Sequence, residues 1–170
     1  MKKCRILRKY AFCVTLKGEN RMVKILFVCH GNICRSPMAE FIMKDMVRKA
    51  EREDDFYIES AAVSTEEIGN DMHRGAKKQL DLMGVPYKRR AARKMTKADY
   101  SRFDLIILMD DYNVTLAERI LGSDPDGKLC MLLDFTDRKG SSIADPWYTG
   151  NFEETYHDIV EGCQAILERY

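Results

Sequence analysis

The chain has 170 residues, which is enough for one well-packed domain and short for two. Hydrophobic residues make up 45% of it and charged residues 32%, a balance that excludes a disordered or membrane-embedded chain and favours a soluble globular one. No apolar run approaches the roughly 18–20 residues of a spanning helix, and the net charge of +1 gives no general reason to expect a nucleic-acid partner.

Positive charge is concentrated at the start of the chain. Residues 1–21 hold seven lysines and arginines against one acid, Glu19, so residues 22–170 are net negative. We expect a basic, disordered N-terminal extension over 1–21 and a single domain over 22–170. The apolar stretch YAFCVTL after a basic start is also compatible with a weak signal peptide, but its apolar core is short and no small-residue cleavage site follows.

The first predicted strand and helix flank the most informative bend of the chain. VKILFV, residues 23–28, is a continuous apolar run of the kind found in a strand buried on both faces. Ser36 and Pro37 then predict an N-cap followed by proline at the first helical position. Apolar residues continue at helical spacing as far as Ala50, so we expect a helix with one buried stripe.

The rest of the chain repeats this alternation of strand and helix. Further strands are predicted at residues 56–63, 104–110 and 128–135. Further helices are predicted from about 72 to 83, over 111–121, and from near Asn151, where Glu154 forms the capping pair. Such alternation implies helical crossovers between parallel strands. The predicted fold class is therefore α/β: a single domain with a four-stranded parallel sheet and helices on both faces.

The cysteines predict neither a metal site nor a disulfide framework. They stand at positions 4, 13, 29, 34, 130 and 163 without a Cys-x-x-Cys pair, and the three histidines are scattered, so zinc-site spacing is absent. A secreted disulfide framework would be denser in a shorter chain, and we therefore predict a reducing, cytoplasmic location. Cys130 and Cys163 lie within apolar patterns and are expected to be small core residues.

The bend after residue 28 is predicted to hold a tetrahedral oxyanion. Gly31 adopts positive φ without penalty, Asn32 is the next best residue for it, and such a turn points successive N–H groups at one spot. The N-terminus of the following helix adds partial positive charge there, and Arg35 supplies a planar fork that suits phosphoryl oxygens. Ligands of parallel sheets bind at this carboxyl edge of the strands.

Cys29 lies at the floor of this predicted nest. A field that favours a phosphate also favours a thiolate, and helix N-termini lower cysteine pKa values from about 8.5 to between roughly 3.5 and 7.5. A thiolate beneath a phosphoryl group is positioned for in-line attack that gives a phosphocysteine, with Ser36 as hydrogen-bond donor to the sulfur. The lysine and Mg²⁺ ligand of an ATP-binding loop are missing, which argues against nucleotide hydrolysis.

A phosphatase also needs a general acid, and ADPWYTGN, residues 144–151, offers Asp145. Pro146 keeps this carboxylate out of helical geometry. Trp147 and Tyr148 supply apolar surface for a slot that takes a flat aromatic leaving group. Taken alone, an Asp-Pro pair is also a common turn.

Together these residues resemble the low-molecular-weight protein tyrosine phosphatase family. The similarity rests on VCHGNICRSPMAE (28–40), SAAVSTEEIGN (60–70), MTKADYSRFDLIILMDDYN (95–113) and DPWY (145–148), and it covers residues 23–170. It implies Cys29 as the nucleophile, Arg35 as the clamp on the phosphate and the transition state, and Asp145 as general acid and then base. It implies no cofactor or metal. The implied phosphate-binding residues are His30, Gly31, Asn32, Ile33, Cys34, Arg35 and Ser36.

The resemblance also implies roles around the loop. Cys34 matches a family cysteine that can trap the nucleophile as a disulfide, and a small core residue is the equal alternative. Glu66 stands where family members often carry an aromatic, so the substrate slot formed with Trp147 and Tyr148 has one wall missing or charged. Trp147 replaces a common tyrosine and keeps a flat surface. Asp110 is expected to be structural, and His30 to border the pocket.

The implied function is hydrolysis of protein tyrosine phosphate, with a phosphotyrosine-bearing protein as partner, no nucleic acid, no membrane, and a monomer or weak homodimer. Relatives that dephosphorylate arginine carry threonine where this chain has Ile33, which favours tyrosine here. Arsenate reductases of similar fold relay oxidation through two further cysteines on a nearby segment, and residues 72–99 contain none. A non-catalytic phosphotyrosine binder is the least favoured alternative, because Cys29, Arg35 and Asp145 are all present.

Overall fold

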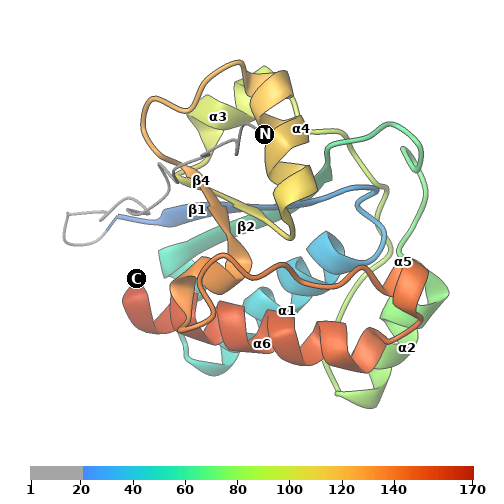
Figure 1. The fold of residues 1–170 in the computed structure, drawn as a ribbon. Coiled ribbons are helices and arrows are strands. Elements are labelled where there is room, and N and C mark those ends of the chain that lie inside the picture. Colours follow the sequence, from blue (N-terminus) through green and yellow to red (C-terminus); the bar gives the residue numbers. More distant parts are fainter. Residues whose placement is uncertain (1–20) are drawn as a thin grey trace.

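The computed structural model describes residues 21–170, in which four parallel strands form one sheet (Figure 1). The strands are β1 (Val23–Cys29), β2 (Phe56–Ala62), β3 (Leu105–Leu108) and β4 (Leu129–Met131), and their order in the sheet is β2-β1-β3-β4. The predicted α/β fold class is confirmed. The predicted basic extension, with its signal-peptide alternative, lies outside the described residues apart from Arg21.

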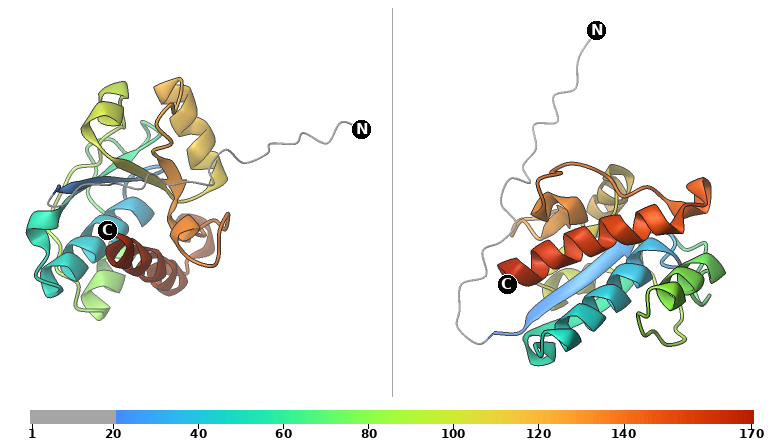
Figure 2. Two further views of the ribbon diagram at one scale, coloured as in Figure 1. Left: turned by 90° about the vertical axis from the view of Figure 1, so that its left-hand side faces the viewer. Right: turned by 90° about the horizontal axis from the view of Figure 1, so that it is seen from below.

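Helices cover both faces of this sheet, as Figures 1 and 2 show. One face carries α1 (Arg35–Lys49), α2 (Arg74–Leu82) and α6 (Phe152–Arg169). The other carries α3 (Lys97–Arg102) and α4 (Asp111–Leu121). None of the helices in residues 21–170 is both long and apolar enough to cross a membrane.

The central strand β1 divides the hydrophobic core into two layers. Its side chains alternate between faces, so Ile25 and Phe27 pack in the core beneath α1 and α6, while Leu26 and Val28 pack in the core beneath α3 and α4. All four side chains are completely buried. Burial on both faces accounts for the unbroken apolar run of β1. Because β1 lies between β2 and β3, its end lies in the middle of the carboxyl edge of the sheet.

The first helix begins two residues earlier than its predicted start. Ser36 was expected to be the N-cap, but Cys34 is the cap residue of α1 and makes no side-chain capping hydrogen bond. The Ser36 hydroxyl is engaged elsewhere, with Cys29 and Asn32, and so serves the bend instead of the helix end. Pro37 is tolerated in this first turn because no intrahelical bond is required from its nitrogen.

The predicted strand over 128–135 is wrong in its second half. Only Leu129–Met131 pairs with β3, and the chain then turns into a 3-10 helix, η2 (Leu132–Phe135). The turn forms because the Asp134 carboxylate accepts the N–H groups of Met131 and Gly140. Apolar side chains continue through η2 because Leu132 and Leu133 fill the same core as α6.

Several short elements and boundaries differ from the prediction. The sequence signals for α3, η1 (Glu53–Asp55) and α5 (Pro146–Thr149) were not recognised. The predicted strands over 56–63 and 104–110 are shorter in the structure, and the helix expected from about residue 72 begins at Arg74, where His73 caps it. The last helix begins as predicted, since Asn151 accepts the Glu154 N–H at 3.1 Å.

Candidate active site

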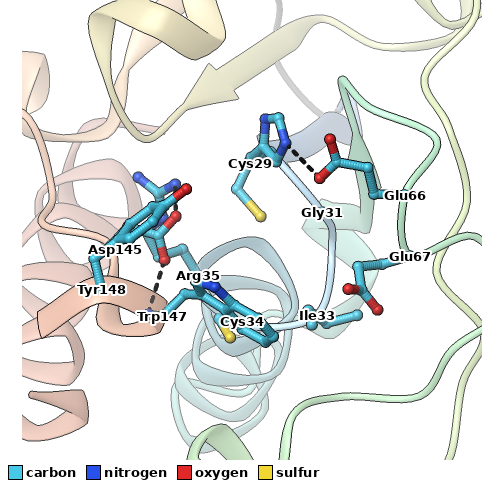
Figure 3. A pocket seen from close by; sticks show the side chains of 11 residues that line it. Cys29, Gly31, Ile33, Cys34, Arg35, Glu66, Glu67, Asp145, Trp147 and Tyr148 are labelled. Atoms are coloured by element: carbon cyan, nitrogen blue, oxygen red, sulfur yellow. Dashed lines mark hydrogen bonds and ion pairs between the residues drawn. The ribbon is translucent and has the colours of Figure 1, made fainter. Parts of the chain in front are cut away.

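A pocket opens at the carboxyl edge of the sheet, where β1 ends at Cys29 (Figure 3). Its volume is about 120 Å³. Residues from three separate segments line it: Cys29, His30, Gly31, Ile33, Cys34, Arg35, Glu66, Glu67, Asp145, Trp147 and Tyr148. We call residues 29–36 the phosphate loop, and the side chains of Glu66, Glu67, Trp147 and Tyr148 the mouth.

The phosphate loop curls around the Cys29 sulfur. Asn32 adopts a left-handed backbone, with φ of 59°, and its N–H donates to the Cys29 Sγ at 3.3 Å. The Ser36 Oγ lies 3.1 Å from the same sulfur. Cys29 is buried, and it lines the pocket from below. A loop of this shape collects N–H groups around one point and favours an anion there.

Asn32 is held in its unusual conformation by partners from distant parts of the chain. Its Nδ2 donates to Ser36 Oγ at 2.8 Å and to Ser60 Oγ at 2.9 Å. Arg90 donates to the backbone oxygen of Asn32 at 2.8 Å and also to its side-chain oxygen. The Ser60 hydroxyl in turn donates to Glu40 at 2.6 Å. The side chains of Asn32 and Ser36 therefore brace the loop and the Cys29 sulfur, and contact of their N–H groups with a phosphate stays a prediction.

Arg35 is buried and lies between two carboxylates. Its Nη1 donates to Asp110 and its Nη2 to Asp145, both at 2.5 Å, and Nη1 also donates to the Ile143 carbonyl at 3.1 Å. Burial opposes its charge, but the negative charges of Cys29 and Asp145 and the bond to Asp110 outweigh burial and raise the pKa of Arg35 above its usual value. Its Nε is buried without a hydrogen-bond partner among residues 21–170.

Asp145 reaches the pocket from the loop before α5. The residue has an extended backbone ahead of Pro146, and it caps the short helix by accepting the Trp147 N–H at 3.1 Å. The second carboxylate oxygen meets Arg35. Asp110, which was predicted to be structural, caps α4 through the Asn113 N–H at 2.6 Å and also orients Arg35.

An aromatic cluster supports the wall of the pocket beside Trp147. The His73 ring meets Trp147 edge-on, with 5.6 Å between ring centroids, and stacks on Phe152 at 5.4 Å. The backbone N–H of His73 donates to the Ile33 carbonyl at 2.8 Å, which connects this cluster to the phosphate loop. Gly75 brings α2 close to α6, since a Cβ on it would lie 2.4 Å from the Phe152 ring.

The opposite wall is acidic. Glu66 and Glu67 follow β2, and Figure 3 shows both side chains beside the phosphate loop. The Glu66 carboxylate lies 3.0 Å from His30 Nε2. The ring of His30 stacks on Tyr112, with 6.2 Å between ring centroids.

Cys34 is a free, buried cysteine packed with Ile33 and Ala92. Burial, and next the charge of Cys29, raise the pKa of this thiol far above its ordinary value. Cys163 is also free and buried, on α6, as expected of a core residue. Within residues 21–170, no three His, Cys, Asp or Glu side chains are grouped so as to hold a metal ion.

The structure brings the predicted site residues together from segments more than a hundred positions apart. Four residues of the site were not predicted: Glu67, which lines the pocket, and Arg90, Ser60 and Glu40, which brace Asn32. Glu67 stands directly beside Glu66, and that adjacency was a usable signal. Arg90 lies in a run of basic residues, KRRAARK (88–94), and nothing local distinguishes it from solvent-exposed neighbours.

Comparisons with known proteins agree on one family. A sequence model of the family described as low molecular weight phosphotyrosine protein phosphatase matches residues 24–170. The chain is 38% identical over 147 residues to the low molecular weight protein-tyrosine-phosphatase YfkJ of Bacillus subtilis, covering 86% of this chain and 94% of YfkJ. The crystal structure of YfkJ superimposes with a TM-score of 0.83 at 37% identity, over 89% of this chain and 96% of that one.

Two further crystal structures are similar. A low molecular weight protein tyrosine phosphatase from Streptococcus pyogenes has a TM-score of 0.77 at 40% identity, over 87% of this chain and 93% of that one. A Drosophila arginine phosphatase has a TM-score of 0.79 at 32% identity, over 87% of this chain and 98% of that one. With a pocket built around Cys29 and Arg35 and a match over nearly all the described residues, the chain belongs to the low molecular weight phosphotyrosine protein phosphatase family.

Proposed function

We propose that the protein hydrolyses phosphotyrosine in proteins through a phosphocysteine intermediate. One observation carries the proposal: the Cys29 sulfur lies inside a curled loop, and the Arg35 guanidinium and the Asp145 carboxylate line the same small pocket. A nucleophile, an anion clamp and an acid thus lie around one point, which is what phosphoryl transfer without a metal requires.

Substrate binding uses hydrogen-bond donors that already line the pocket. Phosphate oxygens accept the N–H groups of the phosphate loop and the nitrogens of Arg35, including the Nε that has no partner among residues 21–170. A bidentate contact with a guanidinium is strong and directional, so the phosphoryl group is fixed above the Cys29 sulfur. Asp110 keeps its contact with Nη1 and holds the guanidinium plane in place.

In the first chemical step the Cys29 thiolate attacks phosphorus, the S–P bond forms and the P–O bond to the tyrosine oxygen breaks. Asp145 gives its proton to the departing phenolate, so a neutral phenol leaves. In the second step a water attacks phosphorus, the ionised Asp145 takes its proton, and the S–P bond breaks. Cys29 leaves as a thiolate, which the Asn32 N–H and the Ser36 hydroxyl stabilise.

The shape of the slot favours tyrosine over a narrower side chain. Ile33 and Trp147 present apolar surface on the way to the sulfur, and Tyr148 stands beside them. Flat apolar walls suit a phenyl ring, which gains from ring contacts as well as from burial.

Hydrolysis of phosphoarginine is the second candidate. It is supported by the similarity to the Drosophila arginine phosphatase, and by Glu66 and Glu67, whose carboxylates attract a guanidinium. The two functions separate in an assay of phosphotyrosine and phosphoarginine peptides of the same sequence. Wild type is expected to prefer phosphotyrosine, and Ile33→Thr to shift the ratio of the two kcat/KM values toward phosphoarginine.

The test of the mechanism is Cys29→Ser. This variant is expected to lose turnover of phosphotyrosine peptide and p-nitrophenyl phosphate while still binding vanadate, because the loop and Arg35 remain. Cys163→Ser is the matched control, since Cys163 is a cysteine of the core and does not line the pocket. Turnover retained by Cys29→Ser would rule out the phosphocysteine route.

Cys34 is proposed to protect the nucleophile during oxidation. A peroxide oxidises the Cys29 thiolate to a sulfenic acid, the Cys34 sulfur attacks it, a disulfide forms and water leaves. A dithiol then restores both cysteines. We expect peroxide-treated wild type to regain activity with dithiothreitol and the Cys34→Ser variant to stay inactive after the same treatment; equal recovery would leave Cys34 a packing residue.

A further inference from the structure

The charge of the pocket lining is unusual for a site that takes an anion. The lining contains three carboxylates, those of Glu66, Glu67 and Asp145, against one guanidinium, that of Arg35. Asp145 and Arg35 pair with each other, so the two glutamates are left to set the charge of the entrance. Like charges repel a phosphate dianion, and this repulsion weakens the binding of a small phosphate ester.

Packing and hydrogen bonds position the two glutamates. The Glu67 stem lies against Gly31, where a Cβ would be only 3.1 Å from Glu67 Cγ. Its carboxylate accepts a hydrogen bond from Asn70 Nδ2 at 2.7 Å. The Glu66 carboxylate contacts the His30 ring, yet its side chain is 70% exposed. Both carboxylates therefore stay beside the loop and keep oxygens free for a substrate group.

Aromatic rings stand around the same entrance. Trp147 is 56% exposed and Tyr148 84% exposed, and Tyr112, which stacks on His30, is 61% exposed. The faces of such rings attract guanidinium and ammonium groups. The Arg35 Nε, which has no hydrogen-bond partner among residues 21–170, is available to a phosphate oxygen deep in the pocket. A cation held by the rings and carboxylates of the entrance therefore belongs to the residues beside the phosphorylated one.

We propose that Glu66 and Glu67 determine specificity by selecting protein segments in which lysine or arginine flanks the phosphotyrosine. The inference rests on the proposed function. A flanking cation offsets the repulsion between the glutamates and the phosphate, and it gains contacts with the carboxylates and the exposed rings. A flanking acid adds to the repulsion. The same charges therefore reject one class of phosphotyrosine segment and favour another.

The test compares phosphotyrosine peptides that differ only in the two residues next to the phosphotyrosine, which are arginine, glutamine or glutamate. Wild type is expected to show a kcat/KM about tenfold higher for the arginine peptide than for the glutamate peptide, which is the scale of two partly exposed ion pairs. This ratio is expected to fall as sodium chloride rises from about 0.05 M to about 0.5 M, because salt screens exposed charges.

Glu66→Gln combined with Glu67→Gln is expected to bring the arginine-to-glutamate ratio close to one. The same variant is expected to have a lower KM for p-nitrophenyl phosphate than wild type, because the repulsion is gone. These opposite changes separate a lost specificity from a damaged fold. The matched control is Glu53→Gln, an exposed residue of η1 at the other end of β2, which is expected to leave the ratio as in wild type.

Equal kcat/KM values for the three peptides in wild type would overturn the inference and leave the proposed function standing. A preference that survives in the double variant would also overturn it, because the charge would then lie elsewhere. Failure to hydrolyse any phosphotyrosine peptide, with hydrolysis of a phosphoarginine peptide, would overturn the proposed function itself.

Discussion

The floor and the mouth of the pocket are held in different ways. The floor is the phosphate loop. Its Asn32 donates hydrogen bonds to Ser36 and Ser60 and accepts one from Arg90. The mouth consists of side chains that are mostly exposed, and Tyr148 is the most exposed of them. Buried, fully bonded groups resist displacement, whereas exposed side chains change at little cost to the fold.

This contrast separates chemistry from selection. Substitutions in the floor are expected to lower the rate for every phosphate ester, since every ester meets the same sulfur and guanidinium. Substitutions in the mouth are expected to re-rank substrates while leaving the loop intact. Single substitutions in each region test this division.

Replacing Arg35 by lysine is expected to lower kcat/KM by about a thousandfold, the usual scale for losing a donor to a charged transition state. Lysine keeps the charge, but it cannot bridge Asp110 and Asp145 and also face the phosphate with a planar fork. The measurement is steady-state hydrolysis of p-nitrophenyl phosphate. Arg138→Lys, on an exposed pair with Asp158, is the control, and a loss of similar size there would refute the assignment.

Replacing Asp145 by alanine is expected to slow phosphotyrosine peptide by about a hundredfold to ten-thousandfold, because an unprotonated phenolate leaves poorly. Aryl phosphates with good leaving groups are expected to lose much less. The check is a series of aryl phosphates ranked by leaving-group pKa, in which the variant shows a steeper dependence than wild type. Parallel dependences would contradict the acid role.

Replacing Arg90 by methionine tests the brace under the floor. The Asn32 backbone oxygen loses its donor and the side-chain oxygen keeps only the Arg93 N–H at 3.2 Å, and a buried polar group without a partner costs about 1–3 kcal/mol of stability. We expect a lower melting temperature and a kcat reduced about tenfold, the rate equivalent of 1.36 kcal/mol, with KM changed less. Arg90→Lys is expected to recover part of both losses, and an unchanged kcat would show that the loop keeps its shape unaided.

Replacing Trp147 by alanine tests the mouth. Loss of one aromatic contact with the substrate ring is worth about 0.5–1.5 kcal/mol, so KM for aryl phosphates is expected to rise about two- to twelvefold. Trp147→Phe keeps a flat surface and is expected to stay close to wild type. A fall in kcat larger than the rise in KM would show that the residue acts on the floor, through Asp145 or His73.

The smallest expected effect is a pH-dependent change in stability on replacing Asp71. Its bond to Lys77, and the N–H groups of Met72 and Arg90, lower its pKa from 3.8 to about 2. A lowered pKa adds stability above the unfolded value and loses it as pH falls toward 2. Asp71→Asn is therefore expected to melt below wild type near pH 6, with the difference shrinking between about pH 4 and pH 2. If the difference in melting temperature between wild type and Asp71→Asn grew as the pH fell, the direction assigned to the Asp71 pKa shift would be wrong.

Much of the site was predictable because its chemistry is local in sequence. Cys29, Gly31, Asn32 and Arg35 lie within seven consecutive positions, and the apolar run before them marks a central strand. Asp145 was recognisable from the DPWY motif, although neither spacing nor periodicity shows that it meets Arg35, 110 positions away.

The unpredicted parts depend on tertiary contacts. Ser36 looks like an N-cap in isolation, but its hydroxyl is taken by Cys29 and Asn32. Arg90 is indistinguishable from its basic neighbours until the fold brings it to Asn32, 58 positions away. The second half of the predicted strand over 128–135 failed for a related reason, since an apolar run serves a buried 3-10 helix as well as a strand.

Cys29, the proposed nucleophile, terminates a strand that has neighbours on both sides, β2 and β3. Opening of either outer strand exposes less of the core than separating β1, so amide protons of β1 are expected to exchange with solvent most slowly. Heat inactivation then coincides with collapse of the entire sheet. The side chains of the mouth lie outside β1, so we expect them to vary among relatives without destabilising the strand that carries the sulfur.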